Sequence, residues 1–395
     1  MKTDRRAAII VLDGVGCGGA SDADVYGDTG SDTLGNLSRA VPGFALPNLQ
    51  QYGLGNLAGL AGVPPAEEPL GAWGVMEPRS AGKDSTTGHW EIAGVHLAHA
   101  FRTYPQGFPA QVLEEFERRT ARPVIGNVVS SGTVVIDRFA EEHRRTGAWI
   151  VYTSADSVFQ IAAHEDVIPL EELYAACETA LGIKLRVSDE DVALVSRVIA
   201  RPFAGEPGSY KRTANRRDFS VEPPSETLLD SLRAAGVETA GVGKVDDLFA
   251  GRSISAQHTS SNAQGIAEIR RWIEGDRSGL LLANLVDFDQ LYGHRNDAAG
   301  FYRALLEFDE VLPALVSSLK KDDFLFITAD HGNDPTTPST DHSRECVPIL
   351  AAGPRVRPGS IGRRETFSDL GATVAEWLGV PFRGRGTSFL PQIIQ

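Results

Sequence analysis

The chain has 395 residues and a formal net charge of -14 at pH 7. At about 100–200 residues per domain, this length predicts two or three domains with a substantial core. The acidic balance argues against a nucleic-acid-binding protein, because affinity for a phosphate backbone depends on clustered Lys and Arg. No apolar stretch reaches the roughly 20 residues of a membrane helix, and no signal peptide follows Met1. We therefore expect a cytoplasmic protein without membrane contact, and no protein partner is indicated.

The three cysteines, Cys17, Cys177 and Cys346, are far apart in the sequence. They form no CxxC or Cys/His pattern typical of a zinc site. A chain of this length needs no disulfide framework, so the cysteine usage agrees with a reducing compartment.

Short apolar runs alternate with helical patterns in the first and last parts of the chain. Residues 7–12 predict a buried strand, and predicted strands return at residues 237–242, 280–286 and 324–328. Predicted helices are residues 225–235, 263–273, 302–320 and 369–378. This alternation predicts an α/β fold with a mostly parallel sheet sandwiched by helices. In such sheets, ligands bind at the carboxyl ends of the strands.

The middle of the chain predicts a second, smaller α/β domain. Its expected elements are helices at residues 110–118, 137–145, 171–179 and 190–200 and a strand at 149–152. We expect a core domain made of residues 1–97 and 222–395, with residues 98–221 inserted as a cap. A domain inserted beside the binding edge of a sheet is well placed to act as a lid.

Acidic residues and histidines follow three of the predicted strands. A single Asp after a strand is more often a turn or helix-capping residue. Several such side chains at one sheet edge, however, would be a costly cluster of like charge without a cation, and mixed O and N ligands suit a divalent ion. Their number exceeds what one small ion usually takes from side chains, so two ions are expected. The candidate ligands are Asp13, Asp289, His294, Asp330, His331 and His342.

The stretch GKDSTTGHWE carries three adjacent hydroxyl residues, Ser85, Thr86 and Thr87. A hydroxyl group beside a metal ion is activated as a nucleophile without a neighbouring base. The same pattern also predicts a capped helix start, and the two interpretations are compatible, because a helix N-terminus presents free N–H groups to a phosphate. Lys83 and His89 are either solvated loop residues or groups that neutralise phosphate charge.

Six segments that span nearly the whole chain carry a recognisable combination of motifs: LDGVGCG, GKDSTTGHWE, YTSADSVFQIAAHE, ARPFAGEPGSYKRT, NLVDFDQLYGHR and TADHGNDPTTPSTDH. Together they resemble the bacterial phosphopentomutases, members of the alkaline phosphatase superfamily. The resemblance implies an alkaline-phosphatase-like core with an inserted cap. It also implies an isomerase that interconverts ribose 1-phosphate and ribose 5-phosphate, or their 2-deoxy forms. Two Mn²⁺ ions, or other divalent cations, would serve as cofactors, and a sugar bisphosphate would activate the enzyme by phosphorylating a hydroxyl side chain.

The resemblance assigns roles to individual residues. One ion would be held by Asp13, Asp330 and His331, and the other by Asp289, His294 and His342. The nucleophile would be Ser85, the residue after Lys-Asp, where the family pattern has a threonine; Thr86 stays open as an alternative acceptor. The substrate would contact Ser154, Asp156, Arg197 and Arg201 of the inserted domain and Lys244 of the core. Arg197 falls within the helix predicted at residues 190–200.

Three alternative functions stay open. The first is a metal-dependent phosphatase or sulfatase, although no Cys of the kind that sulfatases modify stands at the nucleophile position. The second is a cofactor-independent phosphoglycerate mutase of the same superfamily. The third is a catalytically silent binding module that metal ions stabilise.

Overall fold

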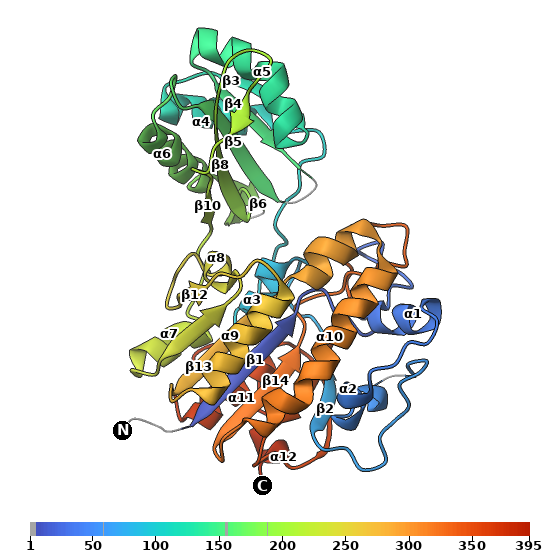
Figure 1. Cartoon of the computed structure of the whole chain (residues 1–395). Coiled ribbons are helices and arrows are strands. Elements are labelled where there is room, and N and C mark those ends of the chain that lie inside the picture. Colours follow the sequence, from blue (N-terminus) through green and yellow to red (C-terminus); the bar gives the residue numbers. More distant parts are fainter. Residues whose placement is uncertain (1–4, 58, 155–156, 188) are drawn as a thin grey trace. The chain divides into compact units, whose positions relative to one another are not determined.

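A computed structural model describes residues 5–57, 59–154, 157–187 and 189–395. The chain divides into two compact units, each with its own sheet (Figure 1). Unit 1 consists of Met1–Ala100 and Pro223–Gln395, and unit 2 consists of Phe101–Glu222. Unit 2 is therefore an insertion into the sequence of unit 1.

Unit 1 is built on an 8-stranded sheet in the order β12-β11-β13-β1-β14-β15-β2-β16. All of its strands run the same way except β15, which is antiparallel to both of its neighbours. The expected mostly parallel sheet is thus confirmed. The strands are β1 (Arg6–Leu12), β2 (Ala72–Met76), β11 (Thr239–Val242), β12 (Ala256–Gln257), β13 (Gly279–Leu285), β14 (Asp323–Thr328), β15 (Val347–Ala352) and β16 (Gly359–Arg364).

The three central strands, β13, β1 and β14, are buried along their whole length. Such continuous apolar runs are typical of strands that helices cover on both faces. In Figure 1, α9 and α10 lie in front of this sheet and α11 lies behind it. The helices of unit 1 are α1 (Thr33–Ala40), α2 (Pro47–Gln51), α3 (Ser85–Ile92), α7 (Leu228–Ala234), α8 (Val245–Leu248), α9 (Asn262–Glu274), α10 (Ala298–Ser317), α11 (Ser368–Leu378) and α12 (Leu390–Ile393), with a 3₁₀ turn η1 (Leu54–Asn56).

Unit 2 has a 6-stranded sheet in which β10, β8, β5, β4 and β3 are neighbours in that order and β9 pairs with β8. A separate hairpin is formed by β6 and β7. The strands are β3 (Val124–Val129), β4 (Trp149–Thr153), β5 (Val158–His164), β6 (Lys184–Val187), β7 (Glu190–Ala193), β8 (Arg197–Ala204), β9 (Lys211–Arg212) and β10 (Arg217–Ser220). The helices are α4 (Ala110–Thr120), α5 (Gly132–Thr146) and α6 (Leu170–Leu181).

The helix predicted at residues 190–200 is wrong, because this segment forms β7 and the first half of β8. Its apolar residues are spaced as on a helix face, but Val192, Val195 and Val198 are β-branched and favour a strand. Arg197 therefore lies on a strand and not on a helix. The other strands that were not predicted are β2, β3, β5, β6, β9, β10, β12, β15 and β16. Of these, β2 and β16 are interrupted by glycine, which hides their pattern.

The three cysteines are free and buried. In the part of the chain that the structure describes, no helix has the length and apolar character needed to cross a membrane. The described fold is therefore held together by packing and hydrogen bonds without a disulfide.

A buried ion pair joins two central strands of unit 1. Arg6 at the start of β1 lies opposite Asp323 at the start of β14, and each residue is 3% exposed. The guanidinium group forms an ion pair with Asp323 and donates hydrogen bonds to the carbonyl oxygens of Ile273 (2.9 Å) and Gly275 (3.0 Å). Arg6 therefore ties both strands to the C-terminal end of α9.

Replacing Asp323 with Ala should lower the free energy of unfolding by about 3–5 kcal/mol, because it leaves the buried Arg6 charge without its partner. Denaturation in urea measures this loss. The matched control is Asp276→Ala, which removes the exposed ion pair with Lys320 and should leave the unfolding midpoint close to that of the wild type. Equal effects of the two substitutions would contradict the role given to Arg6.

Candidate metal centre

The candidate ligands gather at the carboxyl ends of β13, β1 and β14, which are adjacent in the sheet. Asp13 directly follows β1, and its N–H donates to the carbonyl oxygen of Leu285 at the end of β13 (3.2 Å). Asp330 and His331 follow β14. Asp289 and His294 lie after β13 in two short helices, η2 (Phe288–Tyr292) and η3 (Gly293–Arg295), and His342 lies in the loop before β15.

Asp13, Asp330 and His331 form a first group with potential ligand atoms within 4.8 Å of one another. His331 Nε2 lies 3.3 Å from Asp13 Oδ1 and 3.6 Å from Asp330 Oδ2. The three residues are 2–3% exposed. This group is therefore almost completely removed from solvent.

Asp289, His294 and His342 form a second group of the same kind. Asp289 Oδ2 lies 3.1 Å from His294 Nε2, and Asp289 Oδ1 lies 3.3 Å from His342 Nε2. The rings of His342 and His331 have centroids 4.1 Å apart, so the two groups are neighbours. The six residues named from the sequence thus come together in two sets of three. Asp287, two residues before Asp289, lies outside both sets and accepts a hydrogen bond from Asn262 N (2.7 Å).

Hydrogen bonds orient the imidazoles of both groups. His331 Nδ1 lies 3.0 Å from the carbonyl oxygen of Gly332, and His294 Nδ1 lies 2.6 Å from that of Thr340. A carbonyl oxygen can accept a hydrogen bond but cannot donate one, so the Nδ1 atom of each histidine carries the proton. The Nε2 lone pairs, which face the carboxylates, are then available for a metal ion.

Two asparagines that the sequence analysis missed hold the carboxylates in place. Asn284 Nδ2 donates to Asp13 Oδ2 (2.8 Å), and Asn333 Nδ2 donates to Asp289 Oδ1 (2.6 Å). Both asparagines are buried. The signal for Asn284 was present in the sequence, because it is a polar residue inside the apolar run of β13, where it requires a partner.

The charges of the two groups perturb one another strongly. Burial, followed by the charge of Asp330, raises the pKa of Asp13. Burial alone would lower the pKa of His331, but Asp330 and Asp13 raise it well above its ordinary value. Burial would likewise raise the pKa of Asp289, but the charge of His342 and hydrogen bonds from both histidines of its group hold it well below the usual range. The pKa values of Asp13, His331 and Asp289 therefore depend on the charges of their neighbours as well as on burial.

The residues present fit a divalent cation. Asp330 Oδ2 is buried and accepts no hydrogen bond among the described residues, although His89 Nδ1 lies 3.1 Å away. Such an oxygen is expensive to leave unpaired and is available as a ligand. Carboxylate oxygens and imidazole nitrogens together suit Mn²⁺ or Zn²⁺ and similar ions.

Ser85 is the first residue of α3, and the Asp84 side chain caps this helix by accepting a hydrogen bond from Thr87 N (3.0 Å). Ser85 Oγ lies 3.1 Å from His331 Nε2 and 3.5 Å from Asp13 Oδ1. The hydroxyl of Thr87 instead donates to Asp84 (2.6 Å). The expected helix start and the proximity of a hydroxyl group to the first group thus occur together.

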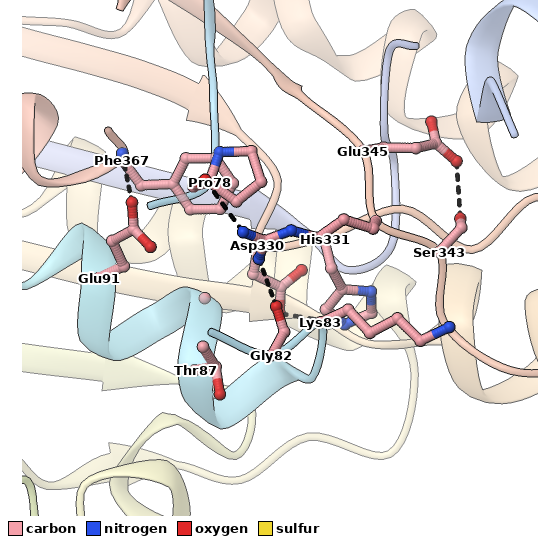
Figure 2. A pocket seen from close by; sticks show the side chains of 12 residues that line it. Pro78, Gly82, Lys83, Thr87, Glu91, Asp330, His331, Ser343, Glu345 and Phe367 are labelled. Atoms are coloured by element: carbon pink, nitrogen blue, oxygen red, sulfur yellow. Dashed lines mark hydrogen bonds and ion pairs between the residues drawn. The ribbon is translucent and has the colours of Figure 1, made fainter. Parts of the chain in front are cut away.

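Figure 2 shows the pocket beside the first group, which is lined by Asp330, His331 and the α3 residues Thr87 and Glu91. Lys83 Nζ lies 3.0 Å from Asp28 Oδ2 and 3.8 Å from Asp341 Oδ2, so its charge is balanced by acids. In the same view a hydrogen bond joins Glu91 to Phe367 N (3.0 Å) and holds the far end of α3.

The expected substrate contacts are distributed over both units. In unit 1, Lys244 precedes α8, and its Nζ donates to Gln290 Oε1 (3.4 Å), next to Asp289. In unit 2, Ser154 follows β4, and Arg197 begins β8 with its Nη1 3.5 Å from Asp218 Oδ2. Arg201 lies further along β8, and its Nε donates to Gln160 Oε1 (3.2 Å). Asp156 lies outside the described residues.

A sequence profile of the metalloenzyme superfamily matches residues 5–382. A protein named phosphopentomutase from Anaeromyxobacter sp. (strain K) is 54% identical over 99% of this chain and 99% of its own. One with the same name from Desulfitobacterium hafniense is 53% identical over 99% of this chain and 100% of its own. The chain therefore belongs to the phosphopentomutase family within the metalloenzyme superfamily.

A solved structure supports the superfamily fold. Phosphoglycerate mutase from Leishmania mexicana, crystallised at low cobalt concentration, has a TM-score of 0.50 and 13% identity over 97% of this chain and 97% of that chain. At this identity the likeness concerns the fold alone. It agrees with the expected core of parallel strands between helices.

Titrating metal-depleted protein with Mn²⁺ should show two bound ions per chain. His342→Asn should weaken binding of the second ion by on the order of 100-fold or more, because it removes a direct imidazole donor, which costs more than the roughly 10–100-fold typical of removing a group that only orients a ligand. Isothermal titration calorimetry measures both values. The matched control is His258→Asn in the more exposed group Asp246, Asp247 and His258, which should leave two ions bound. Equal losses in both variants would contradict the assignment.

Proposed function

We propose that the protein is an isomerase that interconverts ribose 1-phosphate and ribose 5-phosphate, or their 2-deoxy forms, through a phosphorylated Ser85. The family membership supports this activity. The observation that carries the mechanism is the position of Ser85 Oγ, within 3.5 Å of both His331 and Asp13 at the start of α3.

The proposed ligands of one cation are Asp13, Asp330 and His331, and those of the other are Asp289, His294 and His342. Manganese is the proposed metal. When bound, the ions neutralise charge on the transferred phosphoryl group and lower the pKa of a neighbouring hydroxyl. The N-terminus of α3 adds free backbone N–H groups, which favour the negative charge of a phosphate on Ser85.

The resting enzyme carries a phosphoryl group on Ser85, supplied by a sugar bisphosphate. The free hydroxyl of a bound pentose monophosphate attacks this phosphorus, the bond to Ser85 Oγ breaks, and a pentose bisphosphate forms. After reorientation, Ser85 Oγ attacks the other phosphate and the isomeric monophosphate leaves. The proton that the attacking hydroxyl loses in the first step is matched by the one that Ser85 Oγ gains, and in the second step it returns to the sugar oxygen that the phosphoryl group leaves, so phosphate, protons and charge balance over the cycle.

The inserted domain, residues 98–221, is proposed to bind the sugar phosphate and exclude water. Its proposed contacts are Ser154, Asp156, Arg197 and Arg201, with Lys244 from the core. Arginines suit this task, because their planar guanidinium groups pair with phosphate oxygens. Exclusion of water keeps the phosphoryl group from being lost by hydrolysis while the bisphosphate turns.

Ser85→Ala should lower the formation of ribose 5-phosphate from ribose 1-phosphate by on the order of 10³-fold or more, because no other hydroxyl replaces the lost nucleophile. Ser85→Thr keeps the hydroxyl and should remain active, and mass spectrometry should locate the phosphate on residue 85. The assay contains Mn²⁺ and a sugar bisphosphate.

Thr86→Ala is the control for the neighbouring hydroxyl and should retain turnover. Undiminished activity of Ser85→Ala would refute the nucleophile assignment. Release of inorganic phosphate that a bisphosphate does not suppress would indicate a phosphatase, and turnover of phosphoglycerate alone would indicate the other mutase.

A further inference from the structure

His89 lies on α3 one turn after Ser85, and its side chain is 0% exposed. A side chain without solvent access is in no position to neutralise the phosphate of a substrate. It is also not a solvated loop residue, which was the other expectation from the sequence. Any role of His89 must therefore come from its contacts with the residues that surround it.

Two of these residues belong to the proposed catalytic machinery. His89 Nδ1 lies 2.9 Å from the carbonyl oxygen of Ser85 and 3.1 Å from Asp330 Oδ2. Nδ1 donates its hydrogen bond to the carbonyl oxygen of Ser85, and the Asp330 carboxylate lies within ion-pair distance of the same nitrogen. The other ring nitrogen, Nε2, is buried and has no hydrogen-bond partner among the described residues. The contacts of the imidazole are thus made by Nδ1.

The backbone of α3 is already pressed against Asp330. A Cβ added to Gly88 would lie 2.1 Å from the carbonyl oxygen of Asp330, so only glycine allows this approach. At the far end of the helix, Glu91 accepts hydrogen bonds from Arg79 N (2.8 Å) and Phe367 N (3.0 Å). Gly88 and Glu91 hold the body of the helix, and His89 is the side chain that connects its first turn to a proposed metal ligand.

We propose that His89 is a positioning residue, whose Nδ1 holds the backbone of Ser85 beside the carboxylate of Asp330 and so fixes the nucleophile relative to the first cation. This inference rests on the proposed function for the roles of Ser85 and Asp330. Removing a group that contacts a metal ligand and orients it typically lowers metal affinity or activity by about 10–100-fold. A small displacement of a nucleophile from its productive position lowers the reaction rate by a similar factor.

Two substitutions separate the ring nitrogens. His89→Asn places an amide nitrogen near the position of Nδ1, whereas His89→Gln places one near Nε2. We expect the Asn variant to bind Mn²⁺ like the wild type and to keep most of its kcat. The Gln variant should bind Mn²⁺ about 10–100-fold more weakly and have a kcat reduced by a similar factor, with an unchanged KM for the sugar phosphate, because His89 does not touch the substrate.

The first readout is a calorimetric titration with Mn²⁺ alone, which does not depend on turnover. His143→Gln is the matched control, since His143 is also 0% exposed and lies in unit 2, with its Nδ1 near the carbonyl oxygen of Ala148. This control should lower the melting temperature without changing Mn²⁺ affinity. If His89→Asn does not fold, the comparison of the two Gln variants carries the test.

Wild-type Mn²⁺ affinity in His89→Gln, or equal impairment of the Asn and Gln variants, would overturn the proposal. A loss of Mn²⁺ affinity in His143→Gln as large as that in His89→Gln would overturn it too, since both would then report only the loss of a buried imidazole. A wild type that binds Mn²⁺ but has no mutase activity would refute the proposed function, and the metal-binding comparison would still decide the role of His89.

Discussion

The need to balance buried negative charge governs the candidate site. Asp13 and Asp330 are both almost fully buried, and Asp289 lies close to them. Buried carboxylates are stable only when positive charge or hydrogen-bond donors face them. Three histidines, two buried asparagines and the N–H of Gly14, which donates to Asp330 Oδ1 (3.2 Å), supply part of this balance. Divalent cations are the groups that would complete it.

The sheet explains why these residues meet. Strand β1 lies between β13 and β14 and is in parallel register with both. Because neighbouring parallel strands end at the same edge of the sheet, the Asp residues that follow these strands lie close together. The buried ion pair of Arg6 and Asp323 lies at the opposite end of β1 and β14. The residues that stabilise these two strands are therefore distinct from the residues of the candidate metal centre.

The sequence was sufficient for features that depend on local pattern. The strands β1, β13 and β14 are mostly apolar runs, and residues of the ligand types follow them closely, so both could be predicted. The segment 190–200 could not, because the spacing of Val192, Val195 and Val198 is compatible with helix and strand, and only packing in unit 2 decides between them. Glycine-interrupted strands such as β2 and β16 likewise gain their structure from their neighbours.

Contacts between segments far apart in the chain also could not be predicted from the sequence. The role of His89 depends on Asp330, which reaches α3 only after the chain has passed through unit 2 and most of the sheet. Asn333 similarly orients Asp289, which lies on another strand end. Residue type and spacing identified the groups that hold charge. They did not identify the groups that orient those charges.

The central claim is that two cations lie side by side next to the hydroxyl of Ser85. A crystal structure of the protein grown with Mn²⁺ and recorded at the manganese absorption edge tests it most directly. The account predicts two anomalous peaks, one bound by Asp13, Asp330 and His331 and the other by Asp289, His294 and His342, with Ser85 Oγ beside the first. No peak at these residues, or a single peak that engages only one of the two groups at saturating Mn²⁺, would contradict it.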